Sequence, residues 1–472
     1  MSAAQAHSIT AVARRVPPQA LIDALASRFG DRFSTGAAIC LQHGRDESAY
    51  PAQPPDAVVF ALSTEDVALT VGLCNQHRTP VIAFGAGSSL EGHLLAVQGG
   101  ICIDLSRMDE VLAIRTEDLS ATVQAGVTRE GLNHALAQSG FFFPVDPGAN
   151  ATIGGMVATA ASGTTTVRYG NMRDHVQSLT VVTAEGKIIR TARRARKSSA
   201  GYCLTQLFTG SEGTLGIVTE ATVKLHPRPE AVAAAVVNFP TVNDAVQAVI
   251  QAIQMGVPLA RAELLDPLTI RAVNAHSGTS LTVAPTLFLE FCGSSAQVAE
   301  QSAVMAEIAE GLGGGAFQWA TLPEERSRLW TPRHKAYFAS LQLRPGCRSL
   351  TTDACVPISA LAECLAETVA DIEAAGILAP VLGHVGDGNF HCLLLIDIDN
   401  PEEVKAAEGI SHRLARRAMR FDGTCTGEHG VGLHKMGYLG EEHGADTVEI
   451  MRKIKRALDP NNILNPGKVV GF

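Results

Sequence analysis

The sequence lacks the patterns that define several large protein classes. No apolar run approaches the roughly 20 residues that a membrane-spanning helix requires. The ten cysteines are scattered and form no Cys-x-x-Cys pair, so we expect reduced thiols in a cytosol-like compartment. The net charge is −9, and the one basic cluster, Arg193–Lys197, is expected at the solvated end of a hairpin, so nucleic acid is not expected as a partner.

A nicotinamide dinucleotide fingerprint is missing as well. The loop Gly85–Gly92 follows the strand-like segment Thr79–Phe84, but the third glycine of the fingerprint falls on Leu90. The next segment, Ile101–Leu105, has the pattern of a strand where the fingerprint needs a helix. A Rossmann unit is therefore disfavoured, although consecutive small residues still expose backbone N–H groups that can hold a pyrophosphate.

Small residues recur in two further segments, Pro147–Gly163 and Gly210–Val218. Such residues usually mark tight turns or close packing. Three loops of this kind in one α+β region fit better with a backbone that wraps along an extended cofactor.

The chain of 472 residues is too long for one hydrophobic core, so we expect two or three domains. Prolines 51, 54 and 55 mark a linker, and Pro227–Pro229 precedes a shift to alternating strands and helices. We expect a helical N-terminal segment over 1–53, a cofactor domain over 54–230, a second domain over 231–420 and a return to the first domain over 421–472. Helices are predicted over 19–29, 64–76, 241–255, 295–312 and 445–458, the second of them capped by Ser63.

The segment Gly383–His391 carries the strongest chemical signal. Its apolar flanks have the pattern of two short strands around a turn at Gly386–Asn389, because Gly and Asn tolerate positive φ. This register places His384 opposite His391, with Cβ atoms roughly 5 Å apart, so that two imidazoles can bind one divalent ion. Glu428 is the expected third ligand, and two histidines with one carboxylate indicate a catalytic site with open positions. The alternatives are a solvated turn with incidental histidines, and a metallohydrolase that activates water at the same residues.

Several motifs together resemble one flavoprotein family. They are Phe84–Gly92, Asp146–Gly163, Gly210–Pro227, Gly383–His391, Glu428–Gly432 and Asn465–Lys468. The combination resembles the flavoproteins of vanillyl-alcohol oxidase type, and within them the FAD-linked D-2-hydroxyacid dehydrogenases. Trp330–His334 and Thr351–Pro357 are similar to the members that oxidise D-lactate and reduce a cytochrome or another acceptor.

The resemblance implies an α+β fold with a two-part FAD-binding domain and a ferredoxin-like α/β cap domain. It also implies non-covalent FAD, because relatives that tether the flavin carry His where this chain aligns Ser88. The residues expected to contact FAD are Phe84, Gly85, Ala86, Gly87, Ser88, Ser89, Pro147, Gly148, Thr152, Gly154, Gly155, Ala158, Ser162, Gly163, Tyr169, Gly170, Glu212, Gly213, Gly216, Ile217, Val218 and Asn465.

For the chemistry we expect Zn²⁺ or Mn²⁺ at the three metal ligands, where it lowers the pKa of the substrate hydroxyl. His429 is expected to act as the general base, with a fourth metal ligand or a hydrogen-bond donor to the site as the alternative. Arg333 is expected to bind the substrate carboxylate, because a guanidinium fork matches two oxygens, and a surface salt bridge is its alternative. Asn389 is expected to hydrogen-bond near the metal.

The choice of acid depends on one position. Relatives that take 2-hydroxyglutarate carry a basic residue where this chain aligns Thr351, so the resemblance implies D-lactate or a similar small D-2-hydroxy acid. Oxidation of D-2-hydroxyglutarate or glycolate is the alternative, because Lys335, Arg344 or Arg348 can supply the charge from another direction. A flavin-binding subunit without activity is a third interpretation.

The remaining expectations concern partners and location. Electrons are expected to pass to a cytochrome, a quinone or a similar acceptor, and a homodimer is one assembly that we consider. We expect a cytoplasmic protein, with peripheral attachment at the inner membrane as the variant. Arg14 and Arg15, with no acidic residue before Asp23, give the N-terminus some transit-peptide character, but a short disordered leader is favoured.

Overall fold

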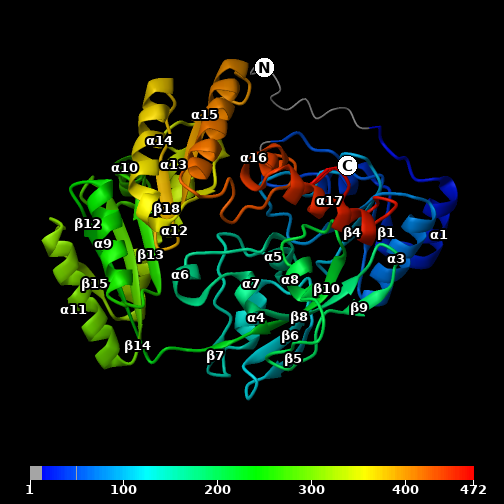
Figure 1. The fold of residues 1–472 in the computed structure, drawn as a ribbon, viewed down its shortest axis with the longest axis horizontal. Coiled ribbons are helices and arrows are strands. Elements are labelled where there is room, and N and C mark those ends of the chain that lie inside the picture. The colour runs from blue at the N-terminus through cyan, green and yellow to red at the C-terminus, as the bar shows by residue number, and fades with distance from the viewer. Residues whose placement is uncertain (1–12, 49, 472) are drawn as a thin grey trace.

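The computed structural model describes residues 13–48 and 50–471, which form two parts side by side (Figure 1). The first part carries the small-residue loops and is coloured blue through cyan to green, with the red C-terminal helices lying on it. The second part is coloured green to orange. Arg14 and Arg15 are held on the first part by Asp56 and by backbone carbonyls, so the expected leader falls on residues 1–12, outside the described residues.

Within the described residues, the first part contains eleven strands. They are β1 (Phe33–Ser34), β2 (Ala57–Phe60), β3 (Val81–Phe84), β4 (Ile101–Asp104), β5 (Val111–Arg115), β6 (Ser120–Gln124), β7 (Phe141–Phe142), β8 (Val176–Val182), β9 (Ile188–Arg190), β10 (Ile217–Lys224) and β11 (His226–Pro227). One sheet has the order β1-β2-β4-β3, in which β2, β4 and β3 run parallel. The other is antiparallel with the order β5-β6-β10-β8-β9, and β7 pairs with β11 in a separate ribbon.

Eight helices accompany these strands. They are α1 (Gln19–Phe29), α2 (Ala37–Gln42), α3 (Thr64–Gln76), α4 (Arg129–Ala135), α5 (Ile153–Thr159), α6 (Thr166–Tyr169), α7 (Met172–His175) and α8 (Leu204–Phe208). The bounds of α3 confirm the sequence prediction, because the Ser63 hydroxyl accepts the backbone N–H of Asp66. Val67, Val71 and Cys74 are buried at helical spacing, which fastens α3 to both sheets.

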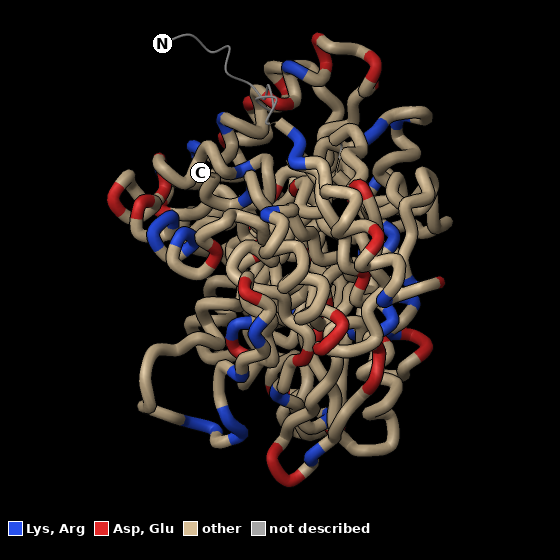
Figure 2. Tube along the Cα trace, turned by 90° about the vertical axis from the view of Figure 1, so that its right-hand side faces the viewer, with Lys and Arg blue, Asp and Glu red and all other residues tan. Residues whose placement is uncertain are grey.

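The basic run Arg193–Lys197 is exposed, as predicted, but it does not form the turn of a hairpin. The turn between β8 and β9 lies at Gly186, whose N–H donates to the carbonyl of Thr183. The run follows β9 instead, in an exposed loop that leads to α8. Figure 2 shows Lys and Arg gathered on a loop that stands away from the body of the protein.

The second part, the cap, is built on one antiparallel sheet. Its strands are β12 (Ala231–Asn238), β13 (Arg261–Leu265), β14 (Thr286–Gly293), β15 (Gln318–Ala320), β16 (Arg348–Thr351), β17 (Ala354–Cys355), β18 (Val381–His384) and β19 (Asn389–Ile396). The order is β15-β12-β14-β13-β18-β19-β16, with β17 also paired to β19. The first four strands have the fourth-first-third-second order of a ferredoxin-like sheet, as expected, and the remaining strands extend it.

Helices cover both faces of the cap sheet. They are α9 (Val242–Gln254), α10 (Pro267–Ser277), α11 (Ser295–Gly311), α12 (Pro323–His334), α13 (Ala336–Leu341), α14 (Leu361–Ala375) and α15 (Pro401–Arg420). The helices α9, α11, α14 and α15 enclose the larger core, and α10, α12 and α13 pack on the opposite face. The predicted helices at 241–255 and 295–312 are confirmed within a residue or two, because Thr241 and Ser294 cap α9 and α11.

The face of the cap sheet under α10, α12 and α13 is only partly apolar. Leu265, Phe288 and Leu393 are buried there. Because side chains alternate along a strand, Arg261 and Glu263 lie on the same face as Leu265, farther along β13. The uncovered end of this face therefore carries charge, and it is turned toward the first part.

The C-terminal segment returns to the first part. Helices α16 (Leu439–His443) and α17 (Ala445–Leu458) precede a stretch that pairs with β3, where Val81 exchanges backbone hydrogen bonds with Ile463 and Asn465. The bounds of α17 match the predicted helix 445–458. Within the described residues, no helix is both long enough and apolar enough to cross a membrane.

Candidate active site

One cavity of about 1500 Å³ lies between the two parts. Two residues that were expected to contact FAD, Tyr169 and Gly170, do not line it. Tyr169 instead packs on His226 and hydrogen-bonds the thiol of Cys292 in the cap. The other expected FAD contacts all line the cavity: Phe84, Gly85, Ala86, Gly87, Ser88, Ser89, Pro147, Gly148, Thr152, Gly154, Gly155, Ala158, Ser162, Gly163, Glu212, Gly213, Gly216, Ile217, Val218 and Asn465.

The loop after β3 offers a series of free backbone donors. Among the described residues, no protein acceptor takes a backbone N–H from Gly85 through Leu94. Carbonyls in the same loop are engaged, since Ser89 accepts from Glu47 and Glu91 accepts from Leu433. N–H groups left without partners, beside bonded carbonyls, suit an anion such as a pyrophosphate. The loop therefore fits the diphosphate of FAD.

The hairpin register differs from the prediction. His384 pairs with Asn389 and His391 pairs with Leu382, so the two histidines are diagonal neighbours rather than direct partners. The turn occupies 385–388 instead of 386–389, closed by the Asp387 N–H on the His384 carbonyl. Gly388 has a positive φ of +78°, and a Cβ there would collide with the Val356 carbonyl, so this position of the turn requires glycine. A shift of two in register preserves the face, so the ring centroids still lie 5.5 Å apart.

The three expected metal ligands converge on the cavity wall. One oxygen of Glu428 lies 3.4 Å from Nε2 of His384 and 3.2 Å from Nε2 of His391. Nδ1 of His391 lies 3.0 Å from the Thr352 carbonyl, which can only accept, and Nδ1 of His384 lies 2.7 Å from the carboxylate of Glu263. Both Nδ1 atoms therefore carry hydrogen, and both Nε2 atoms turn toward the Glu428 carboxylate.

This donor set fits a divalent cation. Two imidazole lone pairs directed at a carboxylate repel it unless positive charge lies between them, either as protons or as a metal ion. Burial alone would lower the pKa of His384, but Glu263 and Glu428 raise it well above the usual value. Burial likewise would raise the pKa of Glu428, and the two histidines hold it well below its usual value. Positive charge between these groups, as protons or as a metal ion, is therefore favoured.

Arg333 lines the cavity but is not free, as Nε and Nη2 lie 2.8 and 2.7 Å from one oxygen of Glu263. The other oxygen of Glu263 bonds His384. Sequence reasoning missed Glu263, although a carboxylate within the apolar strand Ala262–Leu265 was a usable signal, because buried charges need partners. The arginine keeps Nη1 and one Nη2 hydrogen for a ligand.

His429 lies beside the metal ligands. Its ring stacks on that of His391 at 5.2 Å with 8° between the planes. Nδ1 is 3.4 Å from a carboxylate oxygen of Glu91, another residue that sequence reasoning missed. Within the described part of the chain, no hydrogen bond engages Nε2, and His429 lines the cavity. This nitrogen is available to accept a proton.

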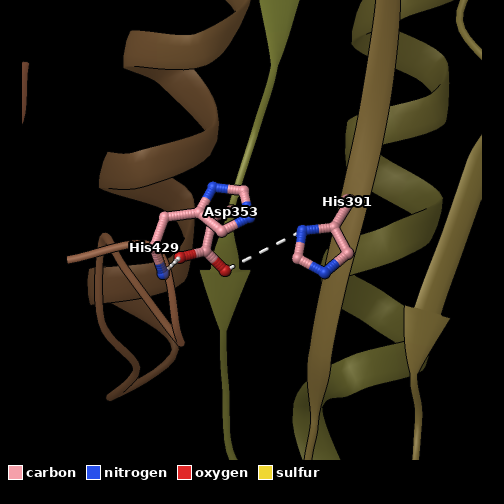
Figure 3. Close-up of side chains that lie close together, drawn as sticks. All are labelled: Asp353, His391 and His429. Atoms are coloured by element: carbon pink, nitrogen blue, oxygen red, sulfur yellow. Dashed lines mark hydrogen bonds and ion pairs between the residues drawn. The ribbon is translucent and has the colours of Figure 1, made fainter. Parts of the chain in front are cut away.

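Asp353 lies between His429 and His391 (Figure 3) and bonds the loop that carries Glu428. One oxygen of this fully buried carboxylate accepts the backbone N–H groups of Glu428 and His429, and it also receives Lys435. The other oxygen accepts the Asn389 amide at 2.8 Å. Asn389 itself does not line the cavity, so its expected place near the metal is indirect. With its oxygens engaged, Asp353 is a poor metal ligand even though it lies near His391 and His429.

A second buried carboxylate fixes the same loop from the first part. Glu212 accepts the backbone N–H groups of Val431 and Gly432 at 2.7 and 2.8 Å, and it pairs with His93 at 3.0 Å. Burial would raise the pKa of Glu212, but His93 lowers it. The prediction gave Glu212 a contact with FAD only. The structure adds a contact that holds the loop carrying Glu428.

Comparison with protein families places this geometry in a class of flavin-dependent oxidoreductases. Residues 55–192 match the family model described as "FAD binding domain", and residues 228–469 match "FAD linked oxidases, C-terminal domain". The chain belongs to the FAD-linked oxidases.

Curated relatives match nearly the whole chain. A "probable D-lactate dehydrogenase, mitochondrial" of Danio rerio is 49% identical over 97% of this chain and 93% of its own length. A "D-lactate dehydrogenase [cytochrome], mitochondrial" of Arabidopsis thaliana is 43% identical over 96% of this chain and 80% of its own length. Among solved structures, p-cresol methylhydroxylase shares the fold with a TM-score of 0.77 and 19% identity, over 98% of this chain and 99% of that one.

Proposed function

We propose that this protein oxidises a small D-2-hydroxy acid, D-lactate in the first place, with non-covalent FAD and a divalent ion, Zn²⁺ or Mn²⁺. The observation that carries the proposal is that His384, His391 and Glu428 converge on the wall of the cavity that the small-residue loops line. The names of the curated relatives support D-lactate as the substrate.

The residues divide the chemistry among them. The small-residue loops would hold FAD, and the bound flavin would supply the acceptor for the hydride from C2 of the substrate. A divalent ion at the three ligands would bring positive charge to the substrate hydroxyl and lower its pKa. His429 would accept the hydroxyl proton at Nε2, and a carboxylate oxygen of Glu91 lies 3.4 Å from its Nδ1. Arg333 would bind the carboxylate through the N–H groups that Glu263 leaves free.

The cavity favours a monocarboxylate. Thr351 lines the cavity, and its hydroxyl bonds Ser349 at 3.0 Å. The cations considered for a distal carboxylate, at positions 335, 344 and 348, do not line the cavity. Arg261 does line it, but its guanidinium is paired with Asp146 and Glu290. An unpaired distal carboxylate buried there would cost several kcal/mol. D-2-hydroxyglutarate is therefore the weaker alternative, and glycolate remains a candidate as a smaller monocarboxylate.

The flavin is proposed to be non-covalent because Ser88 lines the cavity where tethered relatives are expected to carry His. Acid or heat denaturation should release the flavin into the supernatant. Flavin that stays with the precipitated chain would contradict this part of the proposal.

A metallohydrolase at the same ligands would leave the free N–H groups of the loop after β3 without a role.

Electrons are proposed to leave the flavin for a cytochrome or a quinone. A relative named as a cytochrome-type enzyme supports the first acceptor. The cytoplasmic location, peripheral attachment at the inner membrane and the homodimer stay predictions.

The test compares kcat/KM for D-lactate, L-lactate, D-2-hydroxybutyrate, glycolate and D-2-hydroxyglutarate with a dye as electron acceptor. We expect D-lactate or D-2-hydroxybutyrate to lead and the dicarboxylate to be poor. A clear preference for D-2-hydroxyglutarate would show that the assignment from Thr351 is wrong. No turnover of any acid by protein that contains both FAD and metal would favour a subunit without activity.

A further inference from the structure

Glu263 is a carboxylate in an unusual place. It lies in β13, a strand paired on both sides by β14 and β18, and its side chain has no exposed surface. The strand reads Arg-Ala-Glu-Leu-Leu, so the charge interrupts an apolar run. Because a buried charge without partners costs several kcal/mol, this one needs a full set of donors.

The two oxygens of Glu263 serve different partners. One oxygen accepts Nδ1–H of His384 at 2.7 Å. The other accepts Nε–H and Nη2–H of Arg333 at 2.8 and 2.7 Å. The same carboxylate therefore holds a proposed metal ligand and the proposed anchor of the substrate carboxylate.

Strand pairing sets this arrangement. β13 and β18 are antiparallel, with Leu264 opposite Gly383. The next step along this register places Glu263 opposite His384, and side chains at opposite positions of paired strands lie about 5 Å apart at Cβ. The Glu263–His384 contact thus rests on the sheet rather than on a loop. Arg333 joins from the last turn of α12.

We propose that Glu263 is a positioning residue that orients His384 for the metal and Arg333 for the substrate carboxylate, so that both groups are held in register by one side chain. The inference rests on the proposed function, because it assigns the roles of His384 and Arg333 from there. A hydrogen bond from the outer nitrogen of a metal-bound histidine to a carboxylate fixes the ring and increases its basicity as a ligand.

Glu290 provides a matched control on the next strand. It lies in β14, opposite Arg261, and its carboxylate is 3.4 Å from that guanidinium. Like Glu263 it is a carboxylate on the cap sheet that pairs with an arginine lining the cavity. Unlike Glu263, it contacts no proposed metal ligand. Loss of an ion pair alone should therefore affect both variants, whereas loss of histidine orientation should affect only one.

The experiment compares E263Q and E290Q in the FAD-loaded, full-length protein. A glutamine has one acceptor oxygen and no charge, so it cannot replace both oxygens of Glu263, which accept hydrogen bonds from His384 and from Arg333. Competition with a chelator measures the affinity for Zn²⁺ and Mn²⁺, and steady-state kinetics with saturating metal measure KM for D-lactate. We expect E263Q to lose about 10- to 100-fold in metal affinity and to raise KM. E290Q should keep its metal affinity within about threefold of the wild type, because Glu290 does not hydrogen-bond a proposed metal ligand.

The outcomes separate this inference from the proposed function. If H391A binds metal as tightly as the wild type, the proposed metal site is wrong. If H391A loses the metal while E263Q keeps wild-type affinity, Glu263 does not position His384 and only the inference is overturned. An E290Q variant that loses the metal as strongly as E263Q would also overturn it, because general sheet damage would then explain both.

A second measurement covers the case in which E263Q does not fold. Histidines labelled with ¹⁵N in the zinc-loaded wild-type protein report directly on the ring N–H groups. The Nδ1–H of His384, assigned by its absence in H384N, should be protected from exchange with solvent. A His384 Nδ1–H that exchanges as fast as the ring N–H of exposed His77 would overturn the proposal.

Discussion

Two pairs of adjacent histidines in this molecule behave in opposite ways. In the first part, Nε2 of His175 lies 3.1 Å from Nε2 of His226. Nδ1 of His175 is bound to the Asn171 carbonyl at 2.8 Å, so its Nε2 must accept the hydrogen of His226. The two rings satisfy each other. Burial lowers the pKa of both, that of His226 to about 4, so the pair is neutral.

In the cap, His384 and His391 face each other without bonding. Their Nδ1 atoms are bound to Glu263 and to the Thr352 carbonyl, and their Nε2 atoms both turn to Glu428. Burial alone would lower the pKa of His384, but carboxylates raise it well above the usual value. The comparison teaches that a buried histidine pair is structural when its nitrogens are satisfied internally. A buried histidine pair is a candidate pair of metal ligands when one nitrogen of each ring is bound by another group and the two remaining nitrogens face the same position.

The largest effect is expected from H391A, which removes one member of the cap pair. Activity should fall by at least about a thousandfold, because several kcal/mol of charge stabilisation depend on the ion. The flavin content should stay unchanged, since the FAD loops lie in other segments. Dye-linked activity and flavin absorbance are measured together, with H77A at an exposed site as the control. Simultaneous loss of flavin would mean that the two functions are not separable.

A smaller loss is expected from R333K. A lysine keeps the charge but cannot bond Glu263 and a substrate carboxylate in the same fixed geometry. We expect KM to rise and kcat to fall, with kcat/KM about 10- to 100-fold lower, the range for a hydrogen bond to a charged group. Arg328, exposed on the same helix, gives the control R328K. Kinetics of R333K equal to those of R328K would assign the carboxylate to another cation, such as Arg261.

The G148A variant tests the uncharged wall of the cavity that the small-residue segment Pro147–Gly163 forms. Nothing lies within 4 Å of a Cβ added at Gly148, and the residue lines the cavity, so a methyl group there projects into the space for the cofactor. We expect roughly tenfold weaker FAD binding, as for modest overpacking, and an unchanged metal affinity. Reconstitution of the flavin-free protein measures both. Gly437 also has open space around a Cβ but lies away from the cavity, so G437A should bind FAD normally.

The smallest effect concerns acid stability and the histidine pair of the first part. Burial lowers the pKa of His226 to about 4, whereas an unfolded chain has a histidine pKa of about 6.5. As the pH falls from about 6.5 to about 4, the unfolded chain binds a proton at this side chain and the folded chain does not. The free energy of unfolding therefore decreases over this range.

In H226Q the amide can still donate to His175, but this proton uptake is absent. The decline of Tm between about pH 6.5 and pH 4 should be shallower than in the wild type, with little change at pH 7.5. H77Q serves as the control at an exposed site. Equal slopes in H226Q and the wild type would show that the buried pair does not contribute to acid sensitivity.

Local signals carried most of what the sequence could predict. The helix α3 was predicted correctly because its cap and its apolar spacing lie within the helix itself. The hairpin was found from its turn residues, but its register was displaced by two. The residues Gly386–Asn389 are compatible with a turn at 386–389 and with one at 385–388. The observed turn packs Gly388 against the carbonyl of Val356, which is distant in the sequence.

The contacts that sequence reasoning missed join residues that are far apart in the sequence. Glu263 reaches His384 across 121 positions, and Glu212 reaches Val431 across 219. No local pattern encodes such contacts. Asp353 lies within the motif Thr351–Pro357, but the sequence analysis assigned it no role. Its carboxylate accepts backbone N–H groups from the loop at 426–430, which is distant in the sequence. The ligand types were readable from the sequence. The carboxylate of Glu263 left a local signal, but the partners that it orients could not be read from that signal.

The central claim is that oxidation of the substrate requires the ion at the histidine pair of the cap. The most direct measurement is anaerobic mixing of the FAD-loaded protein with D-lactate while the flavin absorbance is followed. The account predicts rapid bleaching with the metal present, almost none after removal of the metal by a chelator, and recovery when Zn²⁺ or Mn²⁺ is added back. Metal-free protein whose flavin is bleached by D-lactate at the original rate would contradict it.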